Sequence, residues 1–193
     1  MIKEYYNENA ESFVENTLNA DMANLYDRFE KYFIKDNSIL DLGCGSGRDS
    51  LYFKNQGYIV TALDYSEKLA KSASKLIGQE VLVKDMREIS YVSKFHGIWA
   101  CASVLHINRI DINMVMKNCA RALKDEGVFY LSFKYGDREE MKNGRYFNFY
   151  NEESFRQLIK KVGGFKILEM FKTTDVRPGR EGEYWLNIIM KKI

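Results

Sequence analysis

The stretch that decides the fold of this chain is Ile39-Leu40-Asp41-Leu42-Gly43-Cys44-Gly45-Ser46-Gly47. A short apolar run contains an acidic residue near its end, and three glycines then follow at alternate positions. Glycine adopts positive φ and carries no Cβ, so such a turn lets the backbone approach a ligand closely. A dinucleotide-binding turn, G-x-G-x-x-G, would place its third glycine one position later. On the turn alone, an ordinary loop between a strand and a helix stays an alternative.

Strands and helices alternate outward from this turn, which predicts a parallel sheet with helices on both faces. Apolar residues at helical spacing predict one or two further helices over residues 3–34. The last two predicted strands have no helix between them, so we expect an antiparallel hairpin. The predicted strands are 39–42, 58–63, 80–83, 96–102, 127–133, 165–171 and 184–190, and the predicted helices between them are 48–56, 66–77, 111–123 and 151–161.

The length of 193 residues is enough to bury a substantial core, and we expect one domain without a linker. The formal net charge is +2, with lysines and glutamates interspersed and no basic arm. A nucleic-acid partner would favour a basic stripe, so the charge argues against one.

The cysteines are Cys44, Cys101 and Cys119, an odd and widely spaced set that predicts reduced thiols in a cytoplasmic protein. With only His96 and His106 as histidines, no metal site is expected. The N-terminus is polar and resembles no signal peptide. Apolar runs stay well below the roughly 18 to 20 residues of a membrane span, so we expect a soluble protein without a membrane partner.

The pattern Asp41-x-Gly43-x-Gly45-x-Gly47 resembles motif I of the class I methyltransferases that use S-adenosylmethionine (SAM). The seven predicted strands are similar to the sheet of that family, in which the last strand inserts antiparallel between the fifth and sixth. The resemblance implies a Rossmann-like α/β domain over 1–193, with an N-terminal helical cap at 1–35 and a SAM-binding core at 36–193. The product would be S-adenosylhomocysteine (SAH).

Polar residues at the carboxyl ends of the predicted strands are candidate ligands of this cofactor. Asp64 ends the second strand 21 residues after Gly43, where a carboxylate can accept both ribose hydroxyls. Its alternative role is to place negative charge at the start of the next helix. At the third strand, the resemblance gives Asp85 the adenine amino group and Met86 the border of the ring. The implied cofactor-binding set is Asp41, Gly43, Cys44, Gly45, Gly47, Asp64, Tyr65, Asp85, Met86, Ala102 and Tyr6.

The fourth strand leads into residues 102–106, which in the family pass beneath the sulfonium and open toward the methyl acceptor. His106 resembles a histidine often found there and is the candidate catalytic residue, with a purely structural role as the alternative. Tyr6 resembles an aromatic residue that closes over the methionine part of SAM, and packing of the N-terminal helix on the sheet is its alternative.

Two polar segments hold candidate substrate residues. Arg177 and Arg180 lie between the last two strands, where a guanidinium can bind an anion with two parallel hydrogen bonds. A solvated connection is equally compatible with this segment. A charged loop is predicted after the fifth strand, up to about residue 149, as a lid in which Arg138, Arg145 and Tyr146 are candidates for substrate contact.

The acceptor is expected to be a small molecule, because the chain is compact and the fourth strand reads Ala100-Cys101-Ala102-Ser103, without the (N/D/S)-P-P-(Y/F/W) motif of base and glutamine methylation. Residues 41–53 resemble most the small tellurite-resistance and thiopurine-like methyltransferases, which implies a soft chalcogen, thiol or other xenobiotic. Methylation of tRNA or another RNA, and a non-catalytic SAM-binding partner module, stay as alternatives. A monomer or homodimer is expected.

Overall fold

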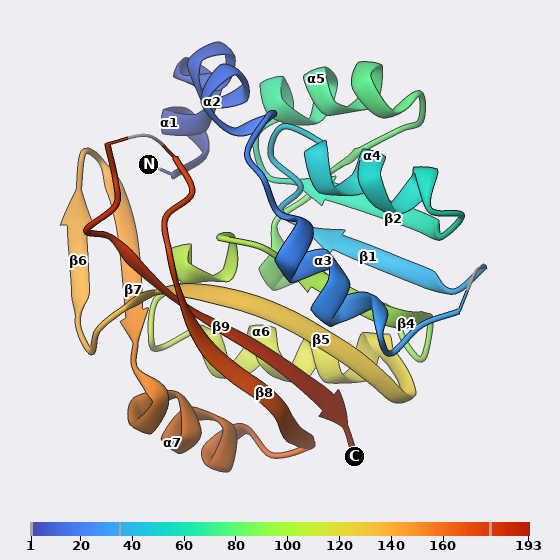
Figure 1. Cartoon of the computed structure of the whole chain (residues 1–193), viewed down its shortest axis with the longest axis vertical. Helices are drawn as coiled ribbons and strands as arrows, with labels where there is room; N and C mark the ends of the chain where they lie inside the picture. Colours follow the sequence, from blue (N-terminus) through green and yellow to red (C-terminus); the bar gives the residue numbers. More distant parts are fainter. Residues whose placement is uncertain (1, 35, 178) are drawn as a thin grey trace.

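The computed structural model describes residues 2–34, 36–177 and 179–193 of the chain. These residues form one mixed sheet with helices on both faces (Figure 1). Its parallel part runs in the order β3 (Leu82–Val83), β2 (Ile59–Asp64), β1 (Ser38–Leu42), β4 (Phe95–Ala100) and β5 (Leu123–Tyr135). The predicted α/β fold is confirmed.

The last strand, β9 (Tyr184–Lys192), lies antiparallel between β5 and β8 (Phe165–Thr174). This is the insertion that the family resemblance implies. The pairing with β5 runs from Val128 opposite Lys191 to Lys134 opposite Trp185, so β9 supports β5 along most of its length.

The strand count is the main difference from the sequence prediction, which has seven strands where the described residues form nine. The extra pair is a hairpin of β6 (Glu139–Lys142) and β7 (Arg145–Tyr150), in place of the predicted charged loop. Asn143 and Gly144 have positive φ of 51° and 72° at its turn, which suits a two-residue hairpin connection. Asn148 and Tyr150 are buried, so one face of β7 packs inward.

Helices α3 (Ala23–Glu30), α4 (Arg48–Asn55) and α5 (Glu67–Ile77) cover one face of the sheet, and α6 (Ile112–Ala122) and α7 (Glu152–Val162) cover the other (Figure 1). The helix ends follow the sequence signals. Ser66 caps α5 by accepting from the Leu69 amide, and Gly78 ends that helix in the left-handed conformation.

The N-terminal segment forms three helices rather than one or two: α1 (Ile2–Glu8), α2 (Ala10–Thr17) and α3. Helix α3 contributes Tyr26 and Phe29 to an aromatic cluster with Phe53 and Trp99, so it belongs to the core. Helix α1 has no buried residue and lies against α5 and β7, at the carboxyl end of the sheet.

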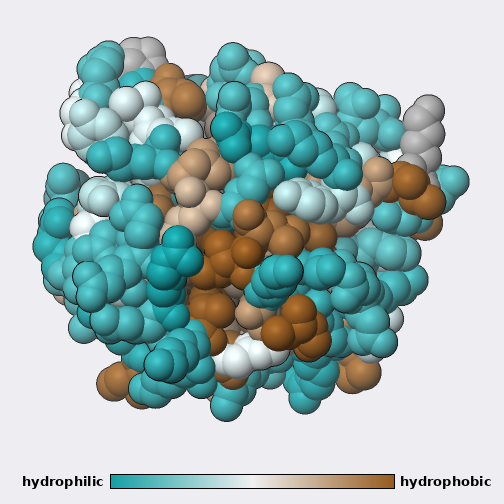
Figure 2. All heavy atoms as spheres, turned by 60° about the horizontal axis from the view of Figure 1, so that its bottom comes forward, coloured by the Kyte–Doolittle hydropathy of each residue, from teal (hydrophilic) through white to brown (hydrophobic). Residues whose placement is uncertain are grey.

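The face in Figure 2 is largely hydrophilic and carries a strip of hydrophobic side chains bordered by hydrophilic ones. None of the helices in the described ranges is long and apolar enough to span a bilayer. Within those ranges, no three or more His, Cys, Asp or Glu side chains lie together as metal ligands would.

Candidate active site

The three glycines of the turn all need to be glycine. Gly43, Gly45 and Gly47 have φ of 81°, 54° and 83°. A Cβ on Gly43 would lie 2.6 Å from the Cβ of Ser103, and one on Gly45 would lie 2.9 Å from the ring of Phe13. The turn therefore adopts the left-handed backbone that the pattern predicts, with β4 and α2 approaching it closely.

Asp64 joins the turn to the strand beside it. Its carboxylate accepts from the Gly45 amide at 2.9 Å through Oδ2 and from the Ser66 amide at 2.8 Å through Oδ1. The amides of Gly43 and Cys44 both donate to the carbonyl of Leu63. Burial raises the pKa of Asp64 above its usual range. Because each carboxylate oxygen can accept more than one hydrogen bond, the carboxylate has capacity for further donors beside these backbone contacts.

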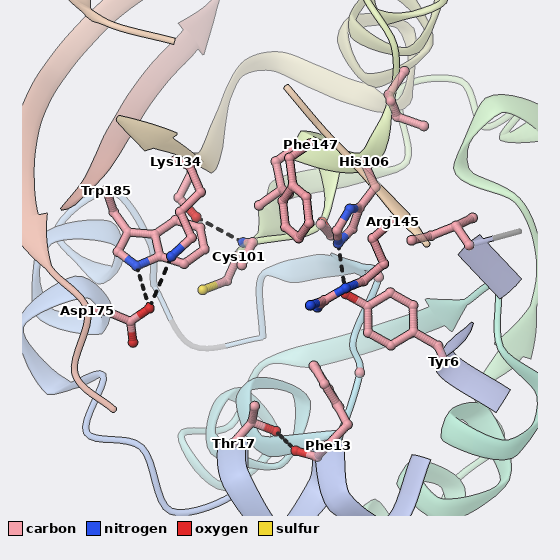
Figure 3. A pocket seen from close by; sticks show the side chains of 18 of the residues that line it. Tyr6, Phe13, Thr17, Cys101, His106, Lys134, Arg145, Phe147, Asp175 and Trp185 are labelled. Atoms are coloured by element: carbon pink, nitrogen blue, oxygen red, sulfur yellow. Dashed lines mark hydrogen bonds and ion pairs between the residues drawn. The ribbon is translucent and has the colours of Figure 1, made fainter. Parts of the chain in front are cut away.

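A pocket of about 910 Å³ opens at this end of the sheet. The glycine turn and the ends of β2, β4 and β5 form its floor, and α1, α2, the β6–β7 hairpin and the β8–β9 connection form its walls (Figure 3). Its volume lies within the range of small-molecule sites. The predicted cofactor residues on its wall are Gly43, Cys44, Gly45, Asp64, Tyr65, Asp85, Met86, Ala102 and Tyr6.

Asp41 and Gly47 lie off this wall. Asp41 is buried beneath the turn and accepts from the Ser50 hydroxyl at 2.6 Å. Gly47 packs against α5, where a Cβ would lie 2.9 Å from that of Ala73. Both residues therefore shape the turn from behind.

Ala102 lies on the wall in a strained conformation. Its φ is 51°, which is uncommon for a residue with a side chain, and its amide donates to the Ser132 hydroxyl at 2.9 Å. The strain bends the chain at the end of β4 toward the pocket, so that Ser103 can donate to the carbonyl of Leu42.

The carboxylate of Asp85 is held by Arg87, two residues further along the chain. The guanidinium and backbone amide of Arg87 both donate to its carboxylate, with Nη2 at 2.5 Å from Oδ2. Burial acts to raise the pKa of Asp85, but the hydrogen bonds from Arg87 outweigh it and the pKa falls below its usual range. A ligand donor would have to share this carboxylate with Arg87.

His106, in the short helix Val104–His106, bridges the hairpin and α1. Its Nδ1 lies 2.7 Å from the carbonyl of Tyr146, which can only accept, so Nδ1 carries the proton. Its Nε2 then accepts from the Tyr6 hydroxyl at 2.8 Å (Figure 3). Desolvation lowers the pKa of His106 to about 4, so the ring is neutral at physiological pH. The predicted catalytic histidine is in direct contact with Tyr6, the residue predicted to close over the methionine part of SAM.

A buried ion pair between Arg48 and Asp49 lies beside the turn, and no sequence motif predicted it. Asp49 accepts from the Arg48 guanidinium, from Tyr26 Oη at 2.5 Å and from Trp99 Nε1 at 2.8 Å. Burial opposes ionisation of Asp49, but Arg48 lowers its pKa below the usual range. Arg48 also donates to the carbonyl of Thr17, which fixes the end of α2 to the pocket.

All four arginines predicted to contact the substrate line the pocket, but Arg138, Arg177 and Arg180 are each paired with an acid of their own segment. Arg177 donates to Asp175 through Nε at 2.9 Å and Nη2 at 2.6 Å. Nitrogen–oxygen distances of 3.1 Å for Arg138–Glu140 and 3.6 Å for Arg180–Glu183 define the other two pairs.

Arg145 differs from these arginines. Its guanidinium carbon lies 4.3 Å from the ring centre of Tyr5 and 5.0 Å from that of Phe147. Its buried Nε has no hydrogen-bond partner, and no carboxylate within the described ranges pairs with it. Figure 3 shows the guanidinium beside Tyr6 and His106, pointing into the pocket. The neighbouring Tyr146 donates its hydroxyl to Glu139.

Comparison with known proteins connects this geometry to a family. Residues 39–127 match the family described as "Methyltransferase domain". A putative methyltransferase of Bacillus subtilis (YqeM) is 30% identical over 114 residues, which are 53% of this chain and 46% of that protein. The chain thus spans about half the length of this curated relative.

Solved structures share the fold over the whole chain. The 1,6-didemethyltoxoflavin-N1-methyltransferase of Burkholderia thailandensis, solved with its acceptor and SAH, superposes with a TM-score of 0.83 at 19% identity, covering 99% of this chain and 87% of that one. A TehB-like SAM-dependent methyltransferase of Corynebacterium glutamicum superposes with a TM-score of 0.73 at 21% identity, covering 100% and 98%.

The family match, the sheet order and the glycine turn beside Asp64 agree with one another. Residues 39–127 are therefore similar to a methyltransferase domain, and the chain shares its fold with solved SAM-dependent methyltransferases.

Proposed function

We propose that this protein transfers the methyl group of SAM to a small-molecule acceptor. The observation that carries the proposal is the carboxylate of Asp64, buried at the end of β2 and hydrogen-bonded to the amide of Gly45 on the wall of the pocket. Around it, the pocket has room for a nucleoside and for a second small molecule.

The residues present fit SAM. The carboxylate of Asp64 can accept two ribose hydroxyls, and the bare backbone of Gly43 and Gly45 leaves space for the ligand beside the turn. Met86 offers an apolar border for the adenine, and Asp85 offers an acceptor for its amino group once Arg87 shares the carboxylate. Tyr6 and Phe13 close the side opposite the floor.

The cofactor supplies an electrophilic methyl group, and the chain supplies alignment and exclusion of water. Alignment of two reactants contributes roughly 7–11 kcal/mol to such a reaction. A general base contributes about 10²–10⁴-fold, or roughly 3–5 kcal/mol. A neutral His106 with a pKa of about 4 is a weak base at neutral pH, so we propose that it orients Tyr6 and the acceptor.

The acceptor is proposed to be small because the site is a walled pocket within one chain. The Burkholderia relative is named for a small-molecule acceptor, and the TehB-like relative matches the resemblance that favours a soft chalcogen or thiol. Cytoplasmic location and the monomeric or homodimeric state stay predictions.

The test combines calorimetry with SAM and a labelled-methyl screen over thiols, selenite, tellurite, amines and tRNA. Asp64→Ala should weaken SAM binding by at least about tenfold, because two charge-assisted hydrogen bonds are lost. Asp125→Ala, which removes a carboxylate that is 97% exposed, is the matched control and should bind normally.

The outcomes separate the alternatives. Failure to bind SAM at millimolar concentration would overturn the proposal. Binding without transfer to any acceptor would favour a non-catalytic module, and a tRNA product whose formation falls steeply with salt would favour RNA methylation.

A further inference from the structure

We infer that the methyl acceptor is an aromatic anion and that Arg145 on β7 binds its acidic group. This inference rests on the proposed methyl transfer and names the class of acceptor. It assigns a role to a residue that neither the glycine turn nor the cofactor requires.

The charges at the hairpin end of the pocket point to Arg145. Lys134 is paired with Asp175 and Glu183, and Arg177 is paired with Asp175. These acids are therefore committed to cations of the chain itself. Arg145 points into the same space without a carboxylate partner in the described ranges, and its positive charge there is not neutralised.

The guanidinium of Arg145 has a hydrogen bond with Tyr6, but its Nε still needs an acceptor. Its Nε is buried without an acceptor, and buried donors in folded proteins are almost always satisfied. The rings of Tyr5 and Phe147 both lie against the guanidinium, and these contacts restrict its orientation. A carboxylate or phenolate bound to this guanidinium would satisfy the donor and the charge together.

The surrounding walls favour a flat ligand. Tyr6, Tyr135, Tyr146, Phe147, Phe149 and Trp185 line this part of the pocket. Aromatic side chains contact planar rings through stacked or edge-to-face arrangements. A planar acid therefore fits the site, because its ring would pack against the aromatic walls and its acidic group would pair with Arg145.

The ring would lie beside His106 and Tyr6, which face the same space (Figure 3). Both are neutral in their hydrogen-bonded pair, so they place no negative charge against the acceptor. The hydrogen bonds of the pair already use both ring nitrogens of His106 and the hydroxyl proton of Tyr6, so Arg145 supplies the charged contact to the bound molecule.

The experiment measures binding of matched acids and amides to the protein saturated with SAH. Benzoate is compared with benzamide, salicylate with salicylamide, and 2-mercaptobenzoate with 2-mercaptobenzamide, each by calorimetry. For the wild-type protein, the acids should bind at least about tenfold more tightly than the amides, the usual effect of a charge-assisted pair. Arg145→Gln should bring the ratio to about one.

Two further variants make the result specific. Arg145→Lys keeps the charge without the planar fork, and should retain a reduced preference for acids. Arg156→Gln removes an exposed arginine on α7 and should keep the full preference. Thermal unfolding and SAH affinity, both expected to match wild type, show that Arg145→Gln is folded.

Several results would overturn the inference: equal binding of acids and amides by wild type, an acid preference that survives in Arg145→Gln, or no binding of any acid at millimolar concentration. Loss of SAH binding in the wild-type protein would instead overturn the proposed function. In that case, a preference for acids measured without SAH would still support the role of Arg145 in binding an anion.

Discussion

At the scale of single residues, two buried carboxylates beneath the glycine turn favour different protonation states. Asp49 has Arg48, Tyr26 and Trp99 as donors, and these lower its pKa. Within the part of the chain that the structure describes, the hydroxyl of Ser50 is the hydrogen-bond donor to Asp41. Burial, and then the charge of Asp49, raise the pKa of Asp41 well above its usual range.

Asp41 should make the protein less stable as the pH rises. Between about 3.9, the usual pKa of an unfolded aspartate, and the raised native pKa, the native state binds more protons than the unfolded state. Stability then falls by up to about 1.4 kcal/mol per pH unit. Asp41→Asn keeps an acceptor for Ser50 and removes this dependence. Urea unfolding at pH 5 and pH 8 measures the free energy of unfolding of both proteins. The stability of Asp41→Asn relative to wild type should be higher at pH 8 than at pH 5, and a relative stability that does not change with pH would contradict the raised pKa of Asp41.

The sequence could predict the residues whose roles are local. The glycine turn and Asp64 are set by spacing along two neighbouring strands, and the structure brings them into contact. The isolation of Arg145 could not be predicted, because pairing of the other arginines depends on acids positioned by the tertiary fold. The contacts of Asp49 likewise come from α3 and β4, which are distant in the chain.

At the scale of elements, α1 is attached to the rest of the protein by polar contacts. Lys3 pairs with Glu67 at 2.5 Å, Asn7 accepts from the Ser66 hydroxyl at 2.6 Å, and Tyr6 donates to His106. None of its residues is buried. The helix therefore contributes walls to the pocket and little to the core.

Deletion of residues 2–8 should separate these contributions. The free energy of unfolding should fall by only about 1–2 kcal/mol, since α1 has no buried residue and its polar pairs are at most partly buried. SAH affinity should fall by about tenfold through loss of the wall around Tyr6. Chemical denaturation and calorimetry measure the two quantities, and unchanged affinity would show that α1 is not part of the cofactor site.

The contact between α1 and His106 also predicts a pH dependence. A native pKa of about 4 lies below the unfolded value of about 6.5, so the stability due to neutral His106 is lost as the pH falls between these values. Protonation at Nε2 would also remove the acceptor for Tyr6.

Histidine NMR should therefore show His106 neutral from pH 7.5 down to about 5.5, with the proton on Nδ1. A titration midpoint near 6.5 would contradict the buried pairing. In Tyr6→Phe, SAH affinity should be lower than in wild type at pH 7, and its fall toward low pH should be shallower.

Element types were predictable where caps and periodicity agree, as in α5 with Ser66 and Gly78, and in α7 with its Asn151 cap. The β6–β7 hairpin differs from the predicted loop, because the charged residues of 134–149 are typical of a loop although Asn143-Gly144 is a hairpin-turn pair. That pair was the available clue.

At the scale of the whole molecule, cofactor binding should appear as stabilisation. At a concentration of SAH about 100 times its dissociation constant, the gain is roughly 2.7 kcal/mol, or about 5–10 °C in Tm for a chain of this size. Differential scanning calorimetry with and without SAH measures it. Adenosine alone should give a smaller shift, and no shift with SAH would contradict a preformed site.

The parallel core was predictable at this scale from the alternation of strands and helices, because each crossover places a helix on the sheet. The position of β9 was not. Both β8 and β9 are apolar enough to pair with β5, and only the family resemblance indicated which one does.

The place of β9 between β5 and β8 has a consequence for synthesis on the ribosome. β5 ends at Tyr135, but its antiparallel partner begins only at Tyr184. Until β9 emerges, the nascent chain presents the long apolar edge of β5 unpaired, a surface that invites pairing with other chains. We therefore expect nascent chains that pause or are truncated between β5 and β9 to be the species most prone to aggregate and most in need of chaperones.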